Sequence, residues 1–246
     1  MSITRRNIGG LNCTIVDDLP DGSTPDVLCI LSHGYGASGE DLVDIGSQIL
    51  AVVPELQSIA RFVFPEAPLS LAELGYGDSS RAWWHLDMEK ITAAIARGEL
   101  RDQRNDLPAE LPAAREAMLE LIRVASEEAD LPPSKIVLGG FSQGSILSID
   151  LALRLPETIG ALVVWSGTLL CEQEWRSLAA NHPQLRVLQT HGETDTLLPF
   201  VAAEWLRDMF FDCKINVDFL SFPGQHSIPQ EGFIGLVKVL HEVATA

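Results

Sequence analysis

One pentapeptide in the chain has the pattern of a catalytic nucleophile. Residues 140–144 read GFSQG and match Gly-x-Ser-x-Gly, with Ser142 at the centre. In that pattern the serine occupies a sharp strand-to-helix turn, and the small residues on either side let the strand and the helix approach each other. An apolar run precedes the pentapeptide and an amphipathic helical pattern follows it, as this turn requires. We therefore predict that Ser142 is a nucleophile, with an ordinary tight turn as the alternative interpretation.

A candidate acid and a candidate base follow this serine in the order Ser, Asp or Glu, His, which one large class of hydrolases uses. Asp195 and His226 each come shortly after an apolar run that we expect to be a strand. Of the six histidines, only His226 has both the required order and a position in such a loop. Glu193 is the nearest competitor for the acid. We prefer Asp195, because the loop continues from there to a helix start at Pro199.

Acyl transfer places negative charge on an oxygen, and preorganised N–H donors usually supply the largest part of its stabilisation. One donor is expected from the amide of the residue after the nucleophile, which is Gln143. The second is expected from the loop after the first buried strand, where residues 33–36 read HGYG. We choose the amide of Tyr35, and a glycine-rich turn without a chemical role is the alternative.

Alternating strand and helix patterns predict the scaffold that must position these residues. Short apolar runs typical of buried parallel strands occur at 27–31, 61–64, 135–138, 161–165, 186–189 and 217–220. Leu11–Val16 is expected to form an early edge strand. Helical patterns occur at 41–53, 88–96, 112–129, 145–155, 172–180, 200–211 and 232–243. We predict an α/β fold with a mostly parallel twisted sheet and helices on both faces, in which all three candidate residues lie at the carboxyl edge.

The composition fits one large α/β domain that spans residues 1–246, with an irregular insert at about 65–106 that borders the active site. Hydrophobic residues make up 46% of the chain, which is enough for a sizeable core. The formal net charge is −17, and no run of lysine or arginine occurs. The sequence therefore lacks the basic surface that binding to nucleic acid or to an anionic membrane requires.

The first ten residues contain Arg5 and Arg6 but no apolar stretch, so we do not expect a signal peptide. No segment reaches the roughly 18 apolar residues of a membrane-spanning helix. We predict a cytoplasmic protein whose four scattered cysteines are reduced thiols. We expect no metal site, because the cysteines and histidines lack the spacing of metal ligands.

The ordered set of motifs resembles the phospholipase/carboxylesterase family of α/β-hydrolases, which includes acyl-protein thioesterases. The motifs are LSHGYG from residue 31, PEAP at 65–68, RAWW at 81–84, GFSQG at 140–144, HGETDTLLP at 191–199 and GQH at 224–226. The resemblance implies the α/β-hydrolase fold, cleavage of carboxylic esters and sometimes of acyl thioesters, and no cofactor. It also implies that Ser142, Asp195 and His226 form the triad, and that Tyr35 and Gln143 form the oxyanion hole.

The same resemblance places Trp83 or Trp84 beside the acyl site. We predict that Trp83, Trp84 and Leu197 or Leu198 line an acyl pocket, with packing in the core as the alternative. Residues 89–106 look longer and more charged than the family's usual connection, and GQHSIP replaces a commoner Gly-His-acid ending. Both departures affect substrate preference more than the reaction.

The predicted function is hydrolysis of small-molecule or lipid-like acyl esters, and of acyl thioesters in some cases, through an acyl-enzyme intermediate. A phospholipase-, lipase- or peptidase-type activity on the same triad is an alternative within enzymes. A catalytically silent binding protein that reuses the fold is the alternative of another class. The sequence does not indicate the oligomeric state.

Overall fold

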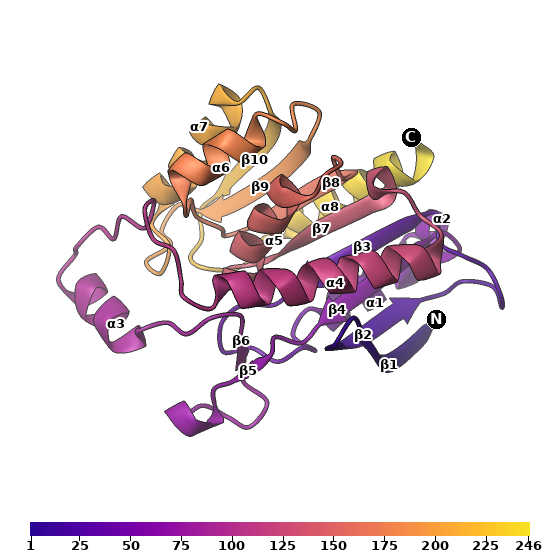
Figure 1. Cartoon of the computed structure of the whole chain (residues 1–246), viewed down its shortest axis with the longest axis horizontal. Coiled ribbons are helices and arrows are strands. Elements are labelled where there is room, and N and C mark those ends of the chain that lie inside the picture. The colour runs from indigo at the N-terminus through magenta and orange to yellow at the C-terminus, as the bar shows by residue number, and fades with distance from the viewer.

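A computed structural model of the protein describes residues 1–246. An eight-stranded sheet runs through its centre in the order β1-β2-β4-β3-β7-β8-β9-β10, with parallel pairing from β4 to β10 (Figure 1). The strands are β1 (Ser2–Ile8), β2 (Leu11–Asp17), β3 (Val27–Ser32), β4 (Ala60–Pro65), β7 (Ile136–Phe141), β8 (Ala161–Trp165), β9 (Arg186–Gly192) and β10 (Asn216–Phe222). The predicted mostly parallel sheet is confirmed, and its carboxyl edge collects the loops that follow β3, β7, β9 and β10.

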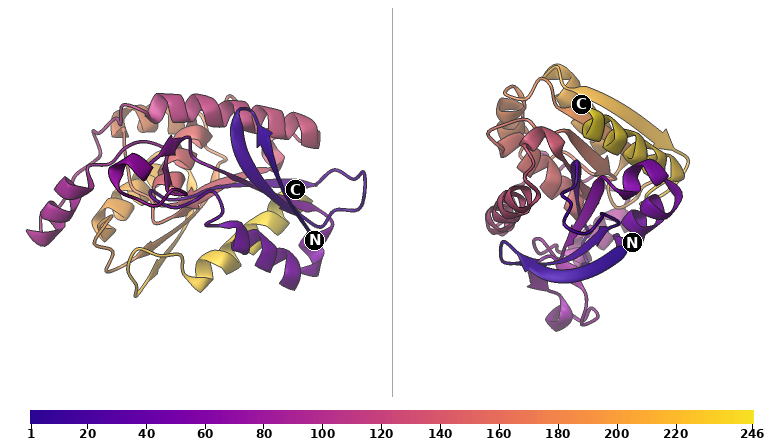
Figure 2. Two further views of the ribbon diagram at one scale, coloured as in Figure 1. Left: turned by 90° about the horizontal axis from the view of Figure 1, so that it is seen from below. Right: turned by 90° about the vertical axis from the view of Figure 1, so that its right-hand side faces the viewer.

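Helices cover both faces of this sheet, so the molecule has three layers (Figure 2). The helices are α1 (Val43–Val52), α2 (Pro54–Gln57), α3 (Met88–Ala96), α4 (Leu111–Ala129), α5 (Gln143–Arg154), α6 (Glu172–Ala179), α7 (Phe200–Asp212) and α8 (Gln230–Thr245). The first two and α8 pack on one face, and α4 to α7 pack on the other. None of these helices is both long enough and apolar enough to cross a lipid bilayer.

Coverage of both faces explains why the central strands are apolar throughout rather than alternating with polar residues. All six residues of β3 and all five of β8 are buried. Successive side chains of a strand point to opposite faces. Leu28 and Ile30 of β3 therefore join the core under α4 and α5, whereas Cys29 and Leu31 join the core under α1 and α8.

The prediction that Leu11–Val16 is an edge strand is wrong. This segment is β2, which pairs on both sides, and β1 forms the edge. The strand β1 escaped the sequence pattern because six of its seven residues are exposed, so it has no apolar face. The sequence feature that could have indicated β1 is the Gly9-Gly10 pair. These glycines form a hairpin turn, with φ of 56° and 93°, across which Ile8 pairs with Leu11.

The irregular segment between β4 and α4 contains a two-stranded sheet of β5 (Leu69–Ser70) and β6 (Arg81–Ala82), the short 3-10 helix η1 (Ala72–Leu74) and α3. Both α3 and the loop with η1 project from the main body (Figure 1). A second 3-10 helix, η2 (Pro133–Lys135), leads into β7.

A buried carboxylate fixes the helix that follows Ser142. Asp150 on α5 is fully buried and accepts hydrogen bonds from Arg115 Nε at 2.6 Å, Arg154 Nε at 3.0 Å and Trp175 Nε1 at 2.9 Å. These partners come from α4, from α5 itself and from α6. The carboxylate therefore ties three helices of one layer together.

We expect Asp150→Ala to lower the free energy of unfolding by about 3–5 kcal/mol, because it leaves two largely buried guanidinium groups without their shared partner. Urea denaturation followed by circular dichroism measures the change. Asp208→Ala is the matched control, since Asp208 pairs with Arg207 at the surface, and there we expect a change of about 1 kcal/mol or less. Equal losses in the two variants would contradict the role of the network.

Candidate active site

The chain reverses within a single residue between β7 and α5. The strand ends at Phe141 and the helix begins at Gln143, so Ser142 alone makes the turn. Ser142 has φ of 53° and ψ of −120°, in the left-handed half of conformational space that non-glycine residues rarely adopt. Its N–H donates to the carbonyl of Trp165 at 2.9 Å, which holds the strained residue against β8.

The two glycines of the pentapeptide allow a very close approach of three backbone segments. A Cβ atom on Gly140 would lie 2.3 Å from the Ser32 carbonyl oxygen, and one on Gly144 would lie 2.1 Å from the same atom. No side chain fits at either position. These distances give the physical reason for the Gly-x-Ser-x-Gly pattern in this chain.

The three predicted triad residues lie in one hydrogen-bonded chain. The Ser142 hydroxyl lies 2.8 Å from His226 Nε2, and His226 Nδ1 lies 2.6 Å from Asp195 Oδ2. The other carboxylate oxygen of Asp195 accepts the N–H groups of Leu197 and Leu198, each at 2.9 Å. The Asp195 side chain is completely buried, so these contacts fix its orientation.

Glu193, the alternative acid, lies outside this chain of contacts. Its carboxylate accepts a hydrogen bond from the Ser221 hydroxyl at 2.9 Å on the exposed side of β10. The geometry therefore favours Asp195 as the partner of His226.

A buried histidine that the sequence analysis did not assign supports the acid turn. His191 Nε2 donates to the Leu198 carbonyl at 2.7 Å and lies 3.4 Å from Asp195 Oδ2. Burial lowers the pKa of His191 below its usual range, so the ring is neutral near pH 7. Its signal in the sequence was its position at the end of a strand, four residues before the acid.

The two amides predicted for the oxyanion hole lie on either side of the serine turn. Tyr35 follows β3 in a turn whose Gly34 comes so close that a Cβ there would lie 3.4 Å from Ser142 Cβ. The Tyr35 N–H makes no hydrogen bond within the protein. Gln143 is the first residue of α5, and N–H groups in the first turn of a helix have no acceptor within that helix. Both donors are free to bind a ligand oxygen.

Buried polar contacts hold the turn that carries Tyr35. His33 Nδ1 donates to the Gly34 carbonyl at 2.8 Å, and His33 Nε2 accepts the Ala67 N–H at 3.1 Å. The indole of Trp83 donates to the His33 carbonyl at 3.0 Å. These contacts explain why PEAP and RAWW accompany HGYG in the sequence.

The side chain of Gln143 has a role that sequence reasoning missed. Its Oε1 accepts the Trp83 N–H at 2.9 Å, and its Nε2 donates to the Trp84 carbonyl at 2.8 Å. The residue after the nucleophile therefore also fixes the segment that supports the Tyr35 turn.

Trp83, Trp84 and Leu198 lie in the hydrophobic core under α4 and α5, with exposed fractions of 0%, 2% and 9%. Both tryptophans are therefore core residues, as the alternative interpretation predicted, and neither side chain is exposed enough to contact an acyl group. Leu197 is the exposed residue of this set. Its carbonyl accepts a hydrogen bond from Arg101, so the insert reaches the acid turn.

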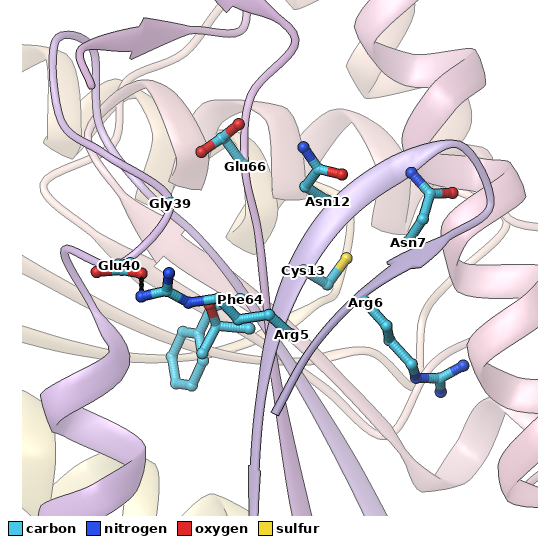
Figure 3. A pocket seen from close by; sticks show the side chains of 10 residues that line it. Arg5, Arg6, Asn7, Asn12, Cys13, Gly39, Glu40, Phe64 and Glu66 are labelled. Atoms are coloured by element: carbon cyan, nitrogen blue, oxygen red, sulfur yellow. Dashed lines mark ion pairs between the residues drawn. The ribbon is translucent and has the colours of Figure 1, made fainter. Parts of the chain in front are cut away.

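A cavity of about 320 Å³ lies apart from these residues, against β1 and β2 (Figure 3). Its walls are mainly polar, and Arg5 pairs there with Glu40. The thiol of Cys13 in this cavity is unreactive near neutral pH, since burial raises its pKa to about 12. No group of three or more His, Cys, Asp or Glu side chains in the protein converges to hold a metal ion.

The sequence profile described as phospholipase/carboxylesterase matches residues 20–243, which is most of the chain. The chain belongs to the phospholipase/carboxylesterase family. This family member is therefore an enzyme, a serine hydrolase of the carboxylesterase/thioesterase type.

Individual relatives of this phospholipase/carboxylesterase-family hydrolase carry two kinds of name. It is 27% identical over 215 residues to acyl-protein thioesterase 1 homolog 1 of Dictyostelium discoideum, which covers 85% of this chain and 87% of the relative. It is 31% identical over 192 residues to a probable carboxylesterase of Oryza sativa subsp. japonica, with 78% and 77% covered.

Solved structures show the same fold. Esterase PE8 superposes with a TM-score of 0.73 at 22% identity and covers 99% of this chain and 100% of its own. A carboxylesterase from Mesorhizobium loti superposes with a TM-score of 0.71 at 15% identity, with 97% and 98% covered. The predicted α/β-hydrolase fold of this family member is confirmed.

We expect Gln143→Ala to lower the free energy of unfolding by about 2–5 kcal/mol, because it leaves a buried N–H and a buried carbonyl of the 83–84 segment unpaired. Thermal and urea unfolding measure the loss. Gln173→Ala on the exposed surface of α6 is the matched control and should change stability by about 0.5 kcal/mol or less. Indistinguishable stabilities would show that the buried contacts of Gln143 are unimportant.

Proposed function

We propose that this hydrolase cleaves carboxylic esters, and acyl thioesters as a second substrate class, through an acyl-enzyme intermediate on Ser142. The hydrogen-bonded chain Ser142–His226–Asp195 is the observation that carries the proposal. The names of the relatives, acyl-protein thioesterase and carboxylesterase, support the two substrate classes.

The reaction begins when the Ser142 hydroxyl attacks the acyl carbonyl carbon. His226 Nε2, 2.8 Å from Oγ, takes the hydroxyl proton as the new C–O bond forms. Asp195 does not take a proton. Its carboxylate holds the Nδ1–H tautomer and stabilises the imidazolium ion, while the Leu197 and Leu198 amides keep the carboxylate in place.

The carbonyl oxygen becomes an oxyanion, and the amides of Tyr35 and Gln143 donate to it. These donors belong to a rigid turn and a helix start, so they need no reorganisation during the reaction. One such donor is typically worth about 2.7–4 kcal/mol of barrier lowering. The positive end of the α5 dipole lies under the same oxygen and adds to this stabilisation.

The tetrahedral intermediate collapses when the bond to the leaving oxygen or sulfur breaks and His226 gives that atom its proton. The acyl group then remains on Ser142 as an ester. Water then hydrolyses the acyl-enzyme through the same steps. His226 takes a proton from the water molecule while the hydroxide adds to the acyl carbon. The bond to Ser142 Oγ then breaks, Ser142 regains its proton from His226, and the carboxylic acid leaves. The enzyme returns to its starting state.

We expect Ser142→Ala to fold normally and to reduce kcat for p-nitrophenyl esters by a factor on the order of 10³ to 10⁶. A fluorophosphonate probe should modify Ser142 in the unaltered protein, and peptide mass spectrometry should find the adduct on no other serine. Near-normal turnover in the variant, or an adduct elsewhere, would reject Ser142 as the nucleophile. Parallel assays with acyl thioesters, phospholipids and peptides separate the related activities.

The two candidate acids provide a matched pair of variants. We expect Asp195→Asn to reduce kcat by a factor on the order of 10³ to 10⁴, because the amide cannot hold His226 in the required tautomer or stabilise its charged form. Glu193→Gln makes the same chemical change two residues away and should leave kcat within about twofold. Comparable losses in both variants, or a loss in Glu193→Gln alone, would contradict the assignment of the acid.

A further inference from the structure

A groove with a volume of about 390 Å³ begins at His226 and runs between the start of α1 and the segment that leads from His226 into α8. Its apolar wall contains Leu42, Ile45, Phe141, Ile228 and Phe233. The Phe141 and His226 rings pack with their centroids 4.8 Å apart, so the groove is continuous with the proposed base. The sequence motifs described above did not indicate this groove.

The polar side of the groove carries two carboxylates, Asp41 and Asp44, together with Gln48 and Ser227. Both carboxylates are exposed, and neither forms an ion pair with any cation of the protein. Glu40, their neighbour, is paired with Arg5. The groove therefore combines an apolar wall with negative charge that the protein itself does not neutralise.

The position of the groove points to the leaving group rather than to the carbonyl oxygen. Tyr35 and Gln143, the oxyanion donors, do not line it, and Ser142 does not line it either. His226 does line it, and this residue must hand a proton to the leaving atom during collapse of the intermediate. Because His226 is the triad residue that lines the groove, we infer that a leaving atom taking its proton from Nε2 directs its substituent toward the groove.

The chemistry of the walls favours a positive charge on that substituent. The faces of aromatic rings attract ammonium groups, and the groove has two phenylalanine rings beside two unpaired carboxylates. The formal net charge of −17 also favours the approach of cations over anions. The positive end of α1 lies under Asp41 and Asp44 and offsets part of their field, so the expected preference is modest.

We propose that this groove binds the leaving group of the substrate and selects alcohol or thiol parts that are apolar and carry an alkylammonium charge. The proposal rests on the esterase function proposed above. It assigns Phe141 and Phe233 to the apolar contact, and Asp41 and Asp44 to charge selection.

Two isosteric acetates test it, 2-(trimethylammonio)ethyl acetate and the neutral 3,3-dimethylbutyl acetate. The esters differ in intrinsic reactivity, so the readout is how the ratio of their kcat/KM values, cationic over neutral, changes between variants. We expect the ratio to fall about three- to tenfold in Asp41→Asn/Asp44→Asn, and to fall by a smaller factor in Phe233→Leu, which keeps an apolar side chain but removes the ring.

Asp21→Asn/Asp26→Asn is the matched control. It removes the same net charge from the exposed loop before β3, at the opposite edge of the sheet, and should leave the ratio unchanged. A ratio that is the same in all variants would overturn the proposal. A ratio that falls equally in the control would also overturn it, because the effect would then come from overall charge.

A second ester pair distinguishes the two parts of the substrate. Methyl trimethylammonioacetate and methyl 3,3-dimethylbutanoate carry the same charge difference in the acyl part. If the groove held the acyl chain, the double substitution at Asp41 and Asp44 would change the ratio for this pair and not for the acetates, which would overturn the proposal. If the unaltered protein hydrolysed neither pair and no p-nitrophenyl ester, the proposed esterase function itself would fail.

Discussion

The close packing of Gly140 and Gly144 against the end of β3 determines the geometry of the candidate site. Both glycines approach the Ser32 carbonyl oxygen more closely than any side chain would allow. Because β7 and α5 are drawn together there, Ser142 alone must reverse the chain, and it does so at a positive φ. The same approach brings the turn after β3 against Ser142. One backbone contact therefore sets both the direction of the nucleophile and the position of the Tyr35 amide.

Two buried histidines, His33 and His191, stabilise the turns that carry Tyr35 and Asp195. In each case the neutral imidazole matches the hydrogen bonds that the ring makes. His33 uses both ring nitrogens, one as a donor to Gly34 and one as an acceptor from Ala67. A second proton on the ring would face the Ala67 N–H and break that contact. His191 donates to Leu198 next to the Asp195 carboxylate. Burial lowers the pKa of both rings, which keeps the two turns in one hydrogen-bonding state near neutral pH.

The sequence predicted the features that follow from local rules. The turn around Ser142 follows from the need for small residues where a strand and a helix meet closely. The positions of Asp195 and His226 follow from the rule that the carboxyl ends of parallel strands lie at one edge of the sheet. The strand β1 was missed because an exposed strand has no apolar period. The roles of Trp83 and of the Gln143 side chain were missed for a different reason: they join segments about 60 residues apart, and no local pattern records such a contact.

The residues that perform the proposed reaction and those proposed to select the substrate contribute differently to stability. Gln143 is buried, and its side-chain amide is hydrogen-bonded through both Oε1 and Nε2, so its replacement disturbs the fold as well as the site. Asp41 and Asp44 are exposed and unpaired, and exchanges at such positions usually alter stability by about 0.5 kcal/mol or less. Substitutions at these two positions are therefore expected to change the proposed leaving-group preference of the enzyme without disturbing the triad. This separation of substrate selection from the catalytic residues is consistent with the names of two relatives. One, at 27% identity to this chain, is named an acyl-protein thioesterase homolog, and the other, at 31%, a probable carboxylesterase.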